Sequence, residues 1–174
     1  MNQPGVFEPG ARYLFTLCTH QRSVVFNEPG HVNLLRRAFR GVMRRRPFRL
    51  DAICVLPDHL HCIWQLPAGD RDFPTRWRLV RIYVEKQLNQ CGPLWEKELL
   101  EQEIADDAEY QQCLDYIHLD PVKHGYSDTP SAWAWSSFRR HVALGIYTMN
   151  WRPELDWKPN AENNTDRLTE AVAG

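Results

Sequence analysis

The stretch FRLDAICVLPDHLHCIWQL, residues 48–66, decides the fold of this chain. Residues 48–56 and 59–66 are rich in β-branched, aromatic and other apolar side chains, a composition that is typical of strands. Pro57 and Asp58 stand between these two runs and favour a tight turn. The stretch therefore predicts two strands that pair as an antiparallel hairpin.

Two histidines in the second run stand one residue apart. Successive side chains of a strand point to opposite faces of the sheet, so His59 and His61 lie on the same face. Such a pair offers two nitrogen ligands to a divalent metal ion. The pair also suits the polar face of a half-buried strand, and these two residues alone leave both interpretations open.

Further segments of secondary structure surround the hairpin. They are a strand at 11–18, a helix at 31–46, a second helix from Pro74 to near Gly92, an irregular strand or loop at 94–104, and a third helix from Asp106 or Asp107 to about Leu119. The third helix is expected to end there because the residue before Pro121 avoids helical geometry. This order fits an α+β fold, in which helices cover one face of a small antiparallel sheet and the other face is free to take a ligand.

The length and composition of the chain fit a single globular domain. We place this domain at residues 1–157, followed by a polar tail at 158–174 that we expect to be disordered. The five cysteines are scattered without a C-x-x-C pair, which argues against a disulfide framework or a structural zinc site. The sequence has no membrane-spanning apolar run and no signal-peptide pattern, so we expect a cytoplasmic protein without a membrane partner.

The net charge of −1 does not by itself indicate a nucleic-acid-binding protein. The arginines are nevertheless concentrated in residues 36–49 and 71–81, and local patches attract a phosphate backbone more than net charge does. A solvated, arginine-rich helix face explains the same pattern equally well. The candidates for contact with DNA phosphates in these two segments are Arg36, Arg37, Arg40, Arg44, Arg76, Arg78 and Arg81.

The segment LDYIHLDPVKHG, residues 114–125, offers a nucleophile and a further metal ligand. Tyr116 and Asp120 are four residues apart and therefore share one face of the predicted helix. We expect Asp120 to be exposed in the last turn. A tyrosine phenol can attack a phosphodiester when a metal ion withdraws charge from the phosphate. The predicted site combines a nucleophile, Tyr116, with the metal ligands His59, His61 and Asp120.

Simpler roles are open for each residue of this segment taken alone. Tyr116 suits the edge of a core, and Asp120 before a proline suits a turn. His118 lies on a different face of the helix and is either structural or DNA-facing. Lys123 and His124 either contact phosphate or cap the loop.

Three blocks of the sequence together resemble a known family. They are PDHLHCIW at residues 57–64, DYIHLDPVKHG at 115–125 and WAWSSF at 133–138, and they resemble the REP-associated tyrosine transposases, which belong to the single-tyrosine HUH nucleases. The resemblance extends from about Tyr13 to Trp151. The histidine pair alone is a weak signal, whereas the three blocks in this order are specific.

The resemblance implies a ferredoxin-like (RRM-like) domain that cuts single-stranded DNA at or near hairpins of repetitive extragenic palindromes. It implies that Tyr116 keeps the 5′-phosphate as a covalent phosphotyrosine and that a 3′-OH is released. It also implies Mg²⁺ or Mn²⁺ as the ion, with His59 and His61 as ligands and the residue four after the tyrosine completing the site. The partner is then hairpin DNA, and the protein acts as a monomer.

Two departures from the family pattern keep a second hypothesis open. The family commonly has Asn where this chain has Asp120, and a carboxylate is expected to bind a hard cation more tightly. Residues 99–105, LLEQEIA, replace an aromatic and basic run, with Gln102 and Ala105 in place of His and Arg. These departures suit a non-cleaving hairpin-DNA-binding protein of regulatory or architectural function. A generic RNA-binding module ranks third, because the strands lack the aromatic pair on which such modules stack bases.

Overall fold

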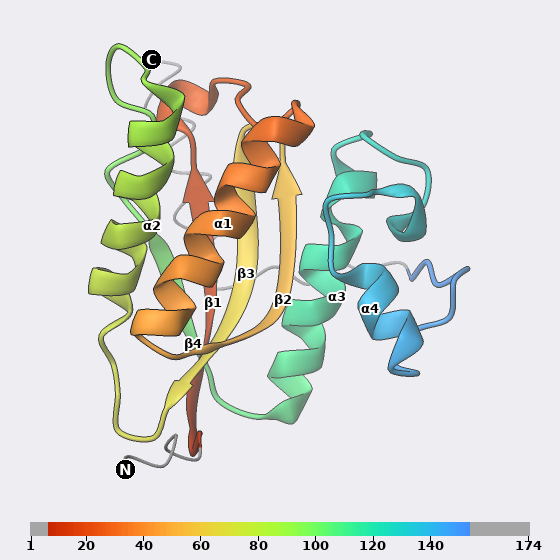
Figure 1. Cartoon of the computed structure of the whole chain (residues 1–174). Coiled ribbons are helices and arrows are strands. Elements are labelled where there is room, and N and C mark those ends of the chain that lie inside the picture. The colour runs from red at the N-terminus through yellow and green to blue at the C-terminus, as the bar shows by residue number, and fades with distance from the viewer. Residues whose placement is uncertain (1–6, 154–174) are drawn as a thin grey trace, which may run out of the picture.

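Four strands form one antiparallel sheet in the computed structural model, which describes residues 7–153 (Figure 1). The strands are β1 (Pro9–Cys18), β2 (Arg49–Leu56), β3 (His59–Pro67) and β4 (Leu100–Ile104), in the order β2-β3-β1-β4. With one helix after β1 and one after β3, the chain follows the β-α-β-β-α-β order of ferredoxin-like folds. The predicted α+β class is confirmed. The predicted domain end at residue 157 and the predicted disordered tail lie outside the described residues.

The hairpin of residues 48–66 forms as predicted. β2 and β3 pair antiparallel around the turn, with Leu56 opposite His59. Within 94–104, where an irregular strand or loop was expected, residues 100–104 form a regular strand that pairs with β1. The cause is tertiary packing, because the two ends of this short strand, Leu100 and Ile104, are buried against the sheet.

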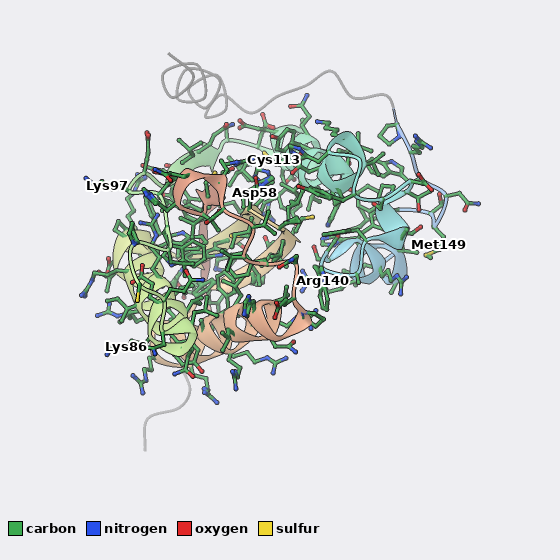
Figure 2. The ribbon with its side chains drawn as sticks, turned by 90° about the horizontal axis from the view of Figure 1, so that it is seen from above. Asp58, Lys86, Lys97, Cys113, Arg140 and Met149 are labelled. Carbon is green, nitrogen blue, oxygen red and sulfur yellow. The ribbon has the colours of Figure 1, made fainter. Side chains whose placement is uncertain are left out.

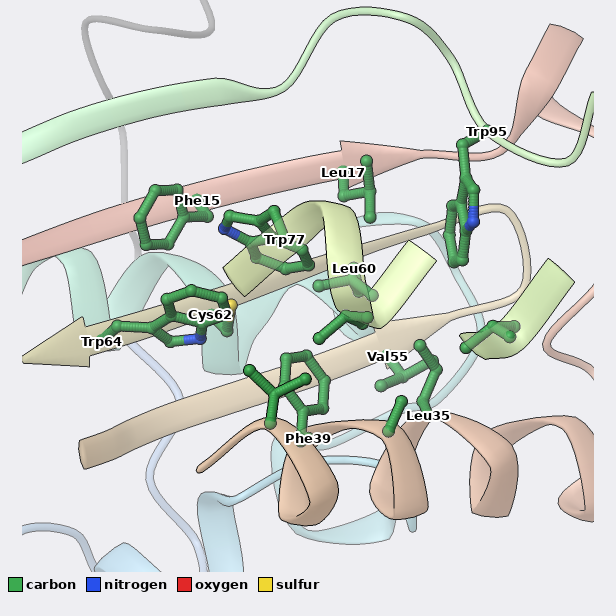
Figure 3. Close-up of a cluster of buried hydrophobic side chains, with 14 of the residues drawn as sticks. Phe15, Leu17, Leu35, Phe39, Val55, Leu60, Cys62, Trp64, Trp77 and Trp95 are labelled. Carbon is green, nitrogen blue, oxygen red and sulfur yellow. The ribbon is translucent and has the colours of Figure 1, made fainter. Parts of the chain in front are cut away.

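Helices α1 (Pro29–Arg45) and α2 (Phe73–Leu88) cover one face of the sheet. Aromatic rings fill the layer between these helices and the sheet (Figure 3). The indoles of Trp64 on β3 and Trp77 on α2 stack with centroids 4.5 Å apart, and Phe15 packs edge-on against both. Leu60 and Cys62 share this face of β3 with Trp64. The intervening residues of β3 must therefore point to the opposite face of the sheet.

The third helix, α3 (Asp107–Lys123), packs on that opposite face together with the short α4 (Phe138–Ala143). Ile63 of β3, Leu114 and Ile117 of α3, and Phe138 of α4 form a second buried cluster there. Figure 2 shows α1 and α3 on opposite sides of the sheet. The face that was expected to be free for a ligand is thus partly covered by a helix. Among the described residues, no helix has both the length and the apolar character needed to cross a membrane.

Helix α3 continues past the proline that was expected to end it. Asp106 caps its first turn, as one of the two predicted alternatives, but the helix runs on through Pro121 to Lys123. The predicted end near Leu119 and the predicted exposure of Asp120 are therefore wrong. A proline inside a helix removes one backbone hydrogen bond. Here Pro121 and the residues before it are buried, and this packing outweighs the lost bond.

Short segments complete the described chain. Two 3₁₀ helices, η1 (His20–Arg22) and η2 (Pro130–Ala132), lie in the connections. Residues 135–137 run along the free edge of β2, where the backbone N–H of Val55 donates to the carbonyl of Trp135 and that of Ser137 donates to the carbonyl of Ile53, both at 2.8 Å. These bonds protect the edge of the sheet from pairing with another strand.

Candidate active site

The hairpin supplies two imidazoles to the face that α3 covers. His59 and His61 are 3 % and 1 % exposed, and their rings lie 5.0 Å apart between centroids. The prediction that both point to one face is confirmed, since Nε2 of each ring approaches the same carboxylate on α3. They share the α3 face of β3 with the second hydrophobic cluster, but their Nε2 atoms point at the carboxylate and not into an apolar environment.

Helix α3 supplies this carboxylate through Asp120, which is 3 % exposed. Its Oδ2 lies 3.0 Å from Nε2 of His59 and 3.2 Å from Nε2 of His61. Its Oδ1 lies 3.4 Å from Nε2 of His124, one helical turn further along. A buried carboxylate is costly unless charged or polar partners surround it, and these three rings provide them. The continuation of α3 through the proline is what brings Asp120 and His124 to the histidine pair.

Tyr116 joins the same cluster from the preceding turn of α3. Its ring lies 5.4 Å from the ring of His61 at an interplanar angle of 75°, and it is 4 % exposed. The ammonium nitrogen of Lys123 lies 4.4 Å from the centroid of the tyrosine ring. The predicted convergence of a tyrosine, a carboxylate and two imidazoles is therefore present, and Lys123 adds a positive charge beside it.

A second layer of side chains orients the two imidazoles. Nδ1 of His59 donates to Oδ1 of Asp58 at 2.6 Å, and Oδ2 of Asp58 pairs with Nε of Arg22 at 3.0 Å. Nδ1 of His61 lies 2.7 Å from Oγ1 of Thr16, its direct neighbour across β1 and β3. Because Nδ1 of each ring is engaged in this layer, Nε2 of each ring faces Asp120.

The charges of the cluster shift its protonation equilibria. Burial lowers the pKa of His59, but the hydrogen bonds to Asp120 and Asp58 outweigh it and leave the pKa raised. Burial lowers the pKa of His61, and Asp120 offsets only part of this effect. For Asp120, burial acts to raise the pKa, but His61, His124 and His59 together hold it well below the usual range. Asp120 is therefore a carboxylate at neutral pH.

The donor set fits a divalent metal ion. Ligand atoms about 2.0–2.2 Å from a common ion lie roughly 2.9–3.6 Å from one another in tetrahedral or octahedral geometry. The three distances from the Asp120 oxygens to imidazole nitrogens, 3.0, 3.2 and 3.4 Å, fall in this range. One ligand atom each from His59, Asp120 and His124 lie within 4.8 Å of one another. Of the predicted ligand set, His59 and Asp120 belong to this group, whereas His61 approaches Asp120 at 3.2 Å but is not a member of it.

The arginines predicted to contact DNA lie in the other helical layer. Those of α1 are exposed, and none of them forms an ion pair with an acidic group of residues 7–153. The guanidinium of Arg36 lies over the ring of Trp135, with 5.3 Å to the ring centroid. The structure does not bring these α1 side chains to the tyrosine site, because α1 covers the opposite face of the sheet; they are Arg36, Arg37, Arg40 and Arg44.

The predicted arginines of α2 differ in their surroundings. Arg76 is buried, and its guanidinium donates to the carboxylate of Asp70 at 2.6 Å and to backbone carbonyls before the helix. It anchors the start of α2, so it is not placed to contact DNA. Arg81 is partly buried and donates to the carbonyl of Lys97 at 3.4 Å, whereas Arg78 is exposed.

Sequence reasoning missed the residues of the second layer. Asp58 was interpreted only as part of the turn, although its position next to His59 was a usable signal. Thr16 and Arg22 carry no signal of their own, because their contacts follow from strand register and loop conformation. His118 proves to be structural: it is fully buried, and its Nε2 lies 2.9 Å from Oγ of Ser137.

No family model matches the chain, but individual proteins do. The chain is 42 % identical over 125 residues to a REP-associated tyrosine transposase of Escherichia coli K12, a match that covers 70 % of this chain and 73 % of that protein. It is 32 % identical over 165 residues to a Haemophilus influenzae protein that bears the same family name, covering 87 % and 93 % of the two chains. A solved structure of a REP-associated tyrosine transposase bound to a REP hairpin has a TM-score of 0.80 and 33 % identity, covering 92 % of this chain and 96 % of the other.

The fold, the clustered site and these similarities define the protein as a tyrosine transposase, and hence as an enzyme. The chain belongs to the REP-associated tyrosine transposases. The family identified from three short blocks of sequence is thus confirmed.

Proposed function

We propose that this transposase is a metal-dependent, single-strand-specific DNA endonuclease and strand transferase that acts on REP-type palindromic hairpins. The observation that carries the proposal is the convergence of Tyr116 with the buried groups His59, His61 and Asp120. A relative whose structure was solved with a REP hairpin supports hairpin DNA as the substrate class.

In this proposal Tyr116 is the nucleophile. Its phenolic oxygen bonds to the scissile phosphorus while the bond from phosphorus to the 3′ oxygen breaks. The 5′-phosphate stays on Tyr116 and a 3′-OH is released, with the phenolic proton lost to solvent and one proton gained by the leaving oxygen. Strand transfer reverses these steps, because a 3′-OH attacks the phosphotyrosine and returns the tyrosine to its free form.

The other side chains of the cluster prepare the phosphate for attack. His59, His61 and Asp120 would hold a Mg²⁺ or Mn²⁺ ion, which supplies charge withdrawal from the scissile phosphate when it is bound. Lys123 would hold a phosphate oxygen beside the phenol. Burial of the cluster strengthens each of these electrostatic contacts.

The exposed arginines of α1 are proposed to contact the DNA backbone away from the cleaved bond. None of the seventeen residues of α1 is acidic, so no neighbour on this helix compensates the positive charge of these arginines. Two of them, Arg36 and Arg40, border a groove of about 270 Å³ whose wall includes Trp135. These contacts would position the hairpin without reading its sequence. The arginines concerned are Arg36, Arg37, Arg40 and Arg44.

The test is the formation of a covalent adduct. Purified protein is incubated with Mn²⁺ and a 3′-labelled palindromic oligonucleotide, so that the label stays on the fragment bound to Tyr116, and adducts are separated under denaturing conditions. We expect an adduct with wild-type protein and none with Tyr116→Phe, while hairpin binding persists because the ring is retained. Tyr110→Phe, on the same helix, serves as the matched control and should form the adduct. An adduct that persists in Tyr116→Phe would refute the assignment.

The same assay decides the alternative of a hairpin-binding protein that does not cleave. The acidic strand β4, with Glu101 and Glu103, supports this alternative, together with Gln102 and Ala105 where the family resemblance implies His and Arg. It predicts hairpin binding that weakens steeply with salt, with no adduct from the wild type at any metal concentration.

A further inference from the structure

The position of His124 is fixed by the helix that carries Asp120. His124 is the C-cap residue of α3, and its backbone N–H donates to the carbonyl of Asp120 at 3.0 Å. Its side chain then returns along the helix, so that Nε2 lies 3.4 Å from Oδ1 of Asp120. The ring lies 5.2 Å from that of His59, with an interplanar angle of 68°. His124 therefore faces the ligand cluster, although its side chain is 43 % exposed.

This geometry suits metal ligation better than simple contact with DNA phosphate. A ring that serves only to meet phosphate would turn its nitrogen toward solvent, whereas Nε2 of His124 points at the carboxylate. Its separation from Asp120 lies in the range of roughly 2.9–3.6 Å expected for two ligands of one ion. Within the described residues, His59, Asp120 and His124 also form a group in which one ligand atom from each lies within 4.8 Å of the other two.

A site with three imidazoles and one carboxylate has a different preference from one rich in oxygen. Mg²⁺ favours oxygen ligands and near-ideal octahedral geometry. Imidazole nitrogens favour first-row transition ions, with Mn²⁺ the weakest of that series and Zn²⁺ and Co²⁺ stronger. Each imidazole added to the set shifts the balance further from Mg²⁺.

We infer that His124 is a fourth protein ligand of the ion and that the site selects a first-row transition ion over Mg²⁺. The inference rests on the proposed function only for what the ion does in catalysis. The coordination of the ion is inferred from the geometry alone. It makes the site His59, His61, Asp120 and His124, with Tyr116 beside it. The exposed side of His124 is then the side from which phosphate reaches the ion.

The experiment measures Mn²⁺ and Mg²⁺ binding to the full chain by titration calorimetry, without DNA. We expect wild-type protein to bind Mn²⁺ more tightly than Mg²⁺. His124→Ala should weaken Mn²⁺ binding by about tenfold or more and change Mg²⁺ binding far less. His31→Ala removes a histidine from α1, on the other side of the sheet, and should leave both affinities unchanged.

Pulsed electron paramagnetic resonance of the Mn²⁺-loaded proteins supplies a second measurement. Nitrogen couplings should indicate one histidine ligand fewer in His124→Ala than in the wild type. His124→Asp keeps a ligand but replaces nitrogen with oxygen, so it should recover affinity while its preference shifts toward Mg²⁺. Because the side chain is half exposed, both variants should fold, and thermal unfolding checks this.

Two results would overturn the inference. One is Mn²⁺ affinity in His124→Ala equal to that of the wild type, with a loss confined to hairpin binding, which would make the residue a phosphate contact. The other is a wild-type preference for Mg²⁺. If the metal titrations give the expected pattern but no covalent adduct forms, only the proposed function fails.

Discussion

The hydrogen bond from His59 to Asp58 gives a quantitative prediction for metal affinity. Nδ1 of His59 donates to the carboxylate at 2.6 Å, and the ring is buried while the carboxylate is 17 % exposed. A charge-assisted bond of this kind contributes about 1.5–3 kcal/mol. Asp58→Ala should therefore weaken Mn²⁺ binding by about 10- to 100-fold, the range typical for loss of a group that orients a histidine ligand.

The matching bond to the other imidazole provides an internal comparison. Oγ1 of Thr16 lies 2.7 Å from Nδ1 of His61, and both groups are buried. This bond lacks a charged partner, so it contributes about 0.5–1.5 kcal/mol. Thr16→Val keeps the shape of the side chain and should weaken Mn²⁺ binding by only about 2- to 12-fold.

Titration calorimetry of the two variants tests the ranking, and urea unfolding of the metal-free proteins separates affinity from stability. Asp58→Asn adds an intermediate case, because the amide oxygen still accepts the bond without its charge. The reasoning is refuted if Thr16→Val weakens Mn²⁺ binding more than Asp58→Ala does. It is refuted equally if Asp58→Ala binds as tightly as the wild type.

Three further predictions concern the rest of the molecule. Trp77→Ala removes one of two stacked, buried indoles and should lower the free energy of unfolding by about 3–5 kcal/mol in urea titrations. With a thiol reagent at pH 8, exposed Cys91 should react at once, whereas Cys113 should react only on unfolding because burial raises its pKa to about 12. Burial lowers the pKa of His141 in the folded protein. As the pH falls, this histidine is therefore protonated at a higher pH in the unfolded chain than in the folded one. Stability should thus fall as the pH drops below about 6.5, and His141→Gln should flatten that part of a pH series of unfolding curves.

The fold was predictable where a local pattern coincides with the tertiary environment. The runs on either side of the Pro57-Asp58 turn have the composition of strands, and both form strands in the sheet. For the same reason the common face of His59 and His61 followed from a period of two residues. The clustering of Tyr116 with Asp120 followed from their spacing of four residues on one helix.

The prediction failed where packing outweighed a local preference. Pro121 was expected to end α3, but the buried contacts of that turn keep it helical. This single difference changes Asp120 from an exposed carboxylate to a buried one. It also brings His124 to the site, although the sequence interpretation had placed that residue in a loop.

The concentration of arginines in two segments of the sequence did not show which arginines are structural and which are exposed. Arg76 stands two residues before Arg78 in the same basic run, yet one is buried against Asp70 and the other is exposed. The difference depends on which helix face meets the sheet. The contacts of Thr16 and Arg22 were beyond prediction for a related reason, since they depend on strand register and on a left-handed backbone at Arg22 (φ 55°).

The carboxylate at position 120 explains how a cluster of three imidazoles is held together before an ion binds. Asp120 attracts each ring and keeps the ligand atoms at separations close to those of a metal site. Little rearrangement is then needed on binding, so less of the binding free energy is spent on ordering side chains. A neutral amide at this position would accept hydrogen bonds from the rings without this charge. Asp120, where the family resemblance implies Asn, therefore favours a preformed site for the proposed ion and is compatible with the proposed chemistry.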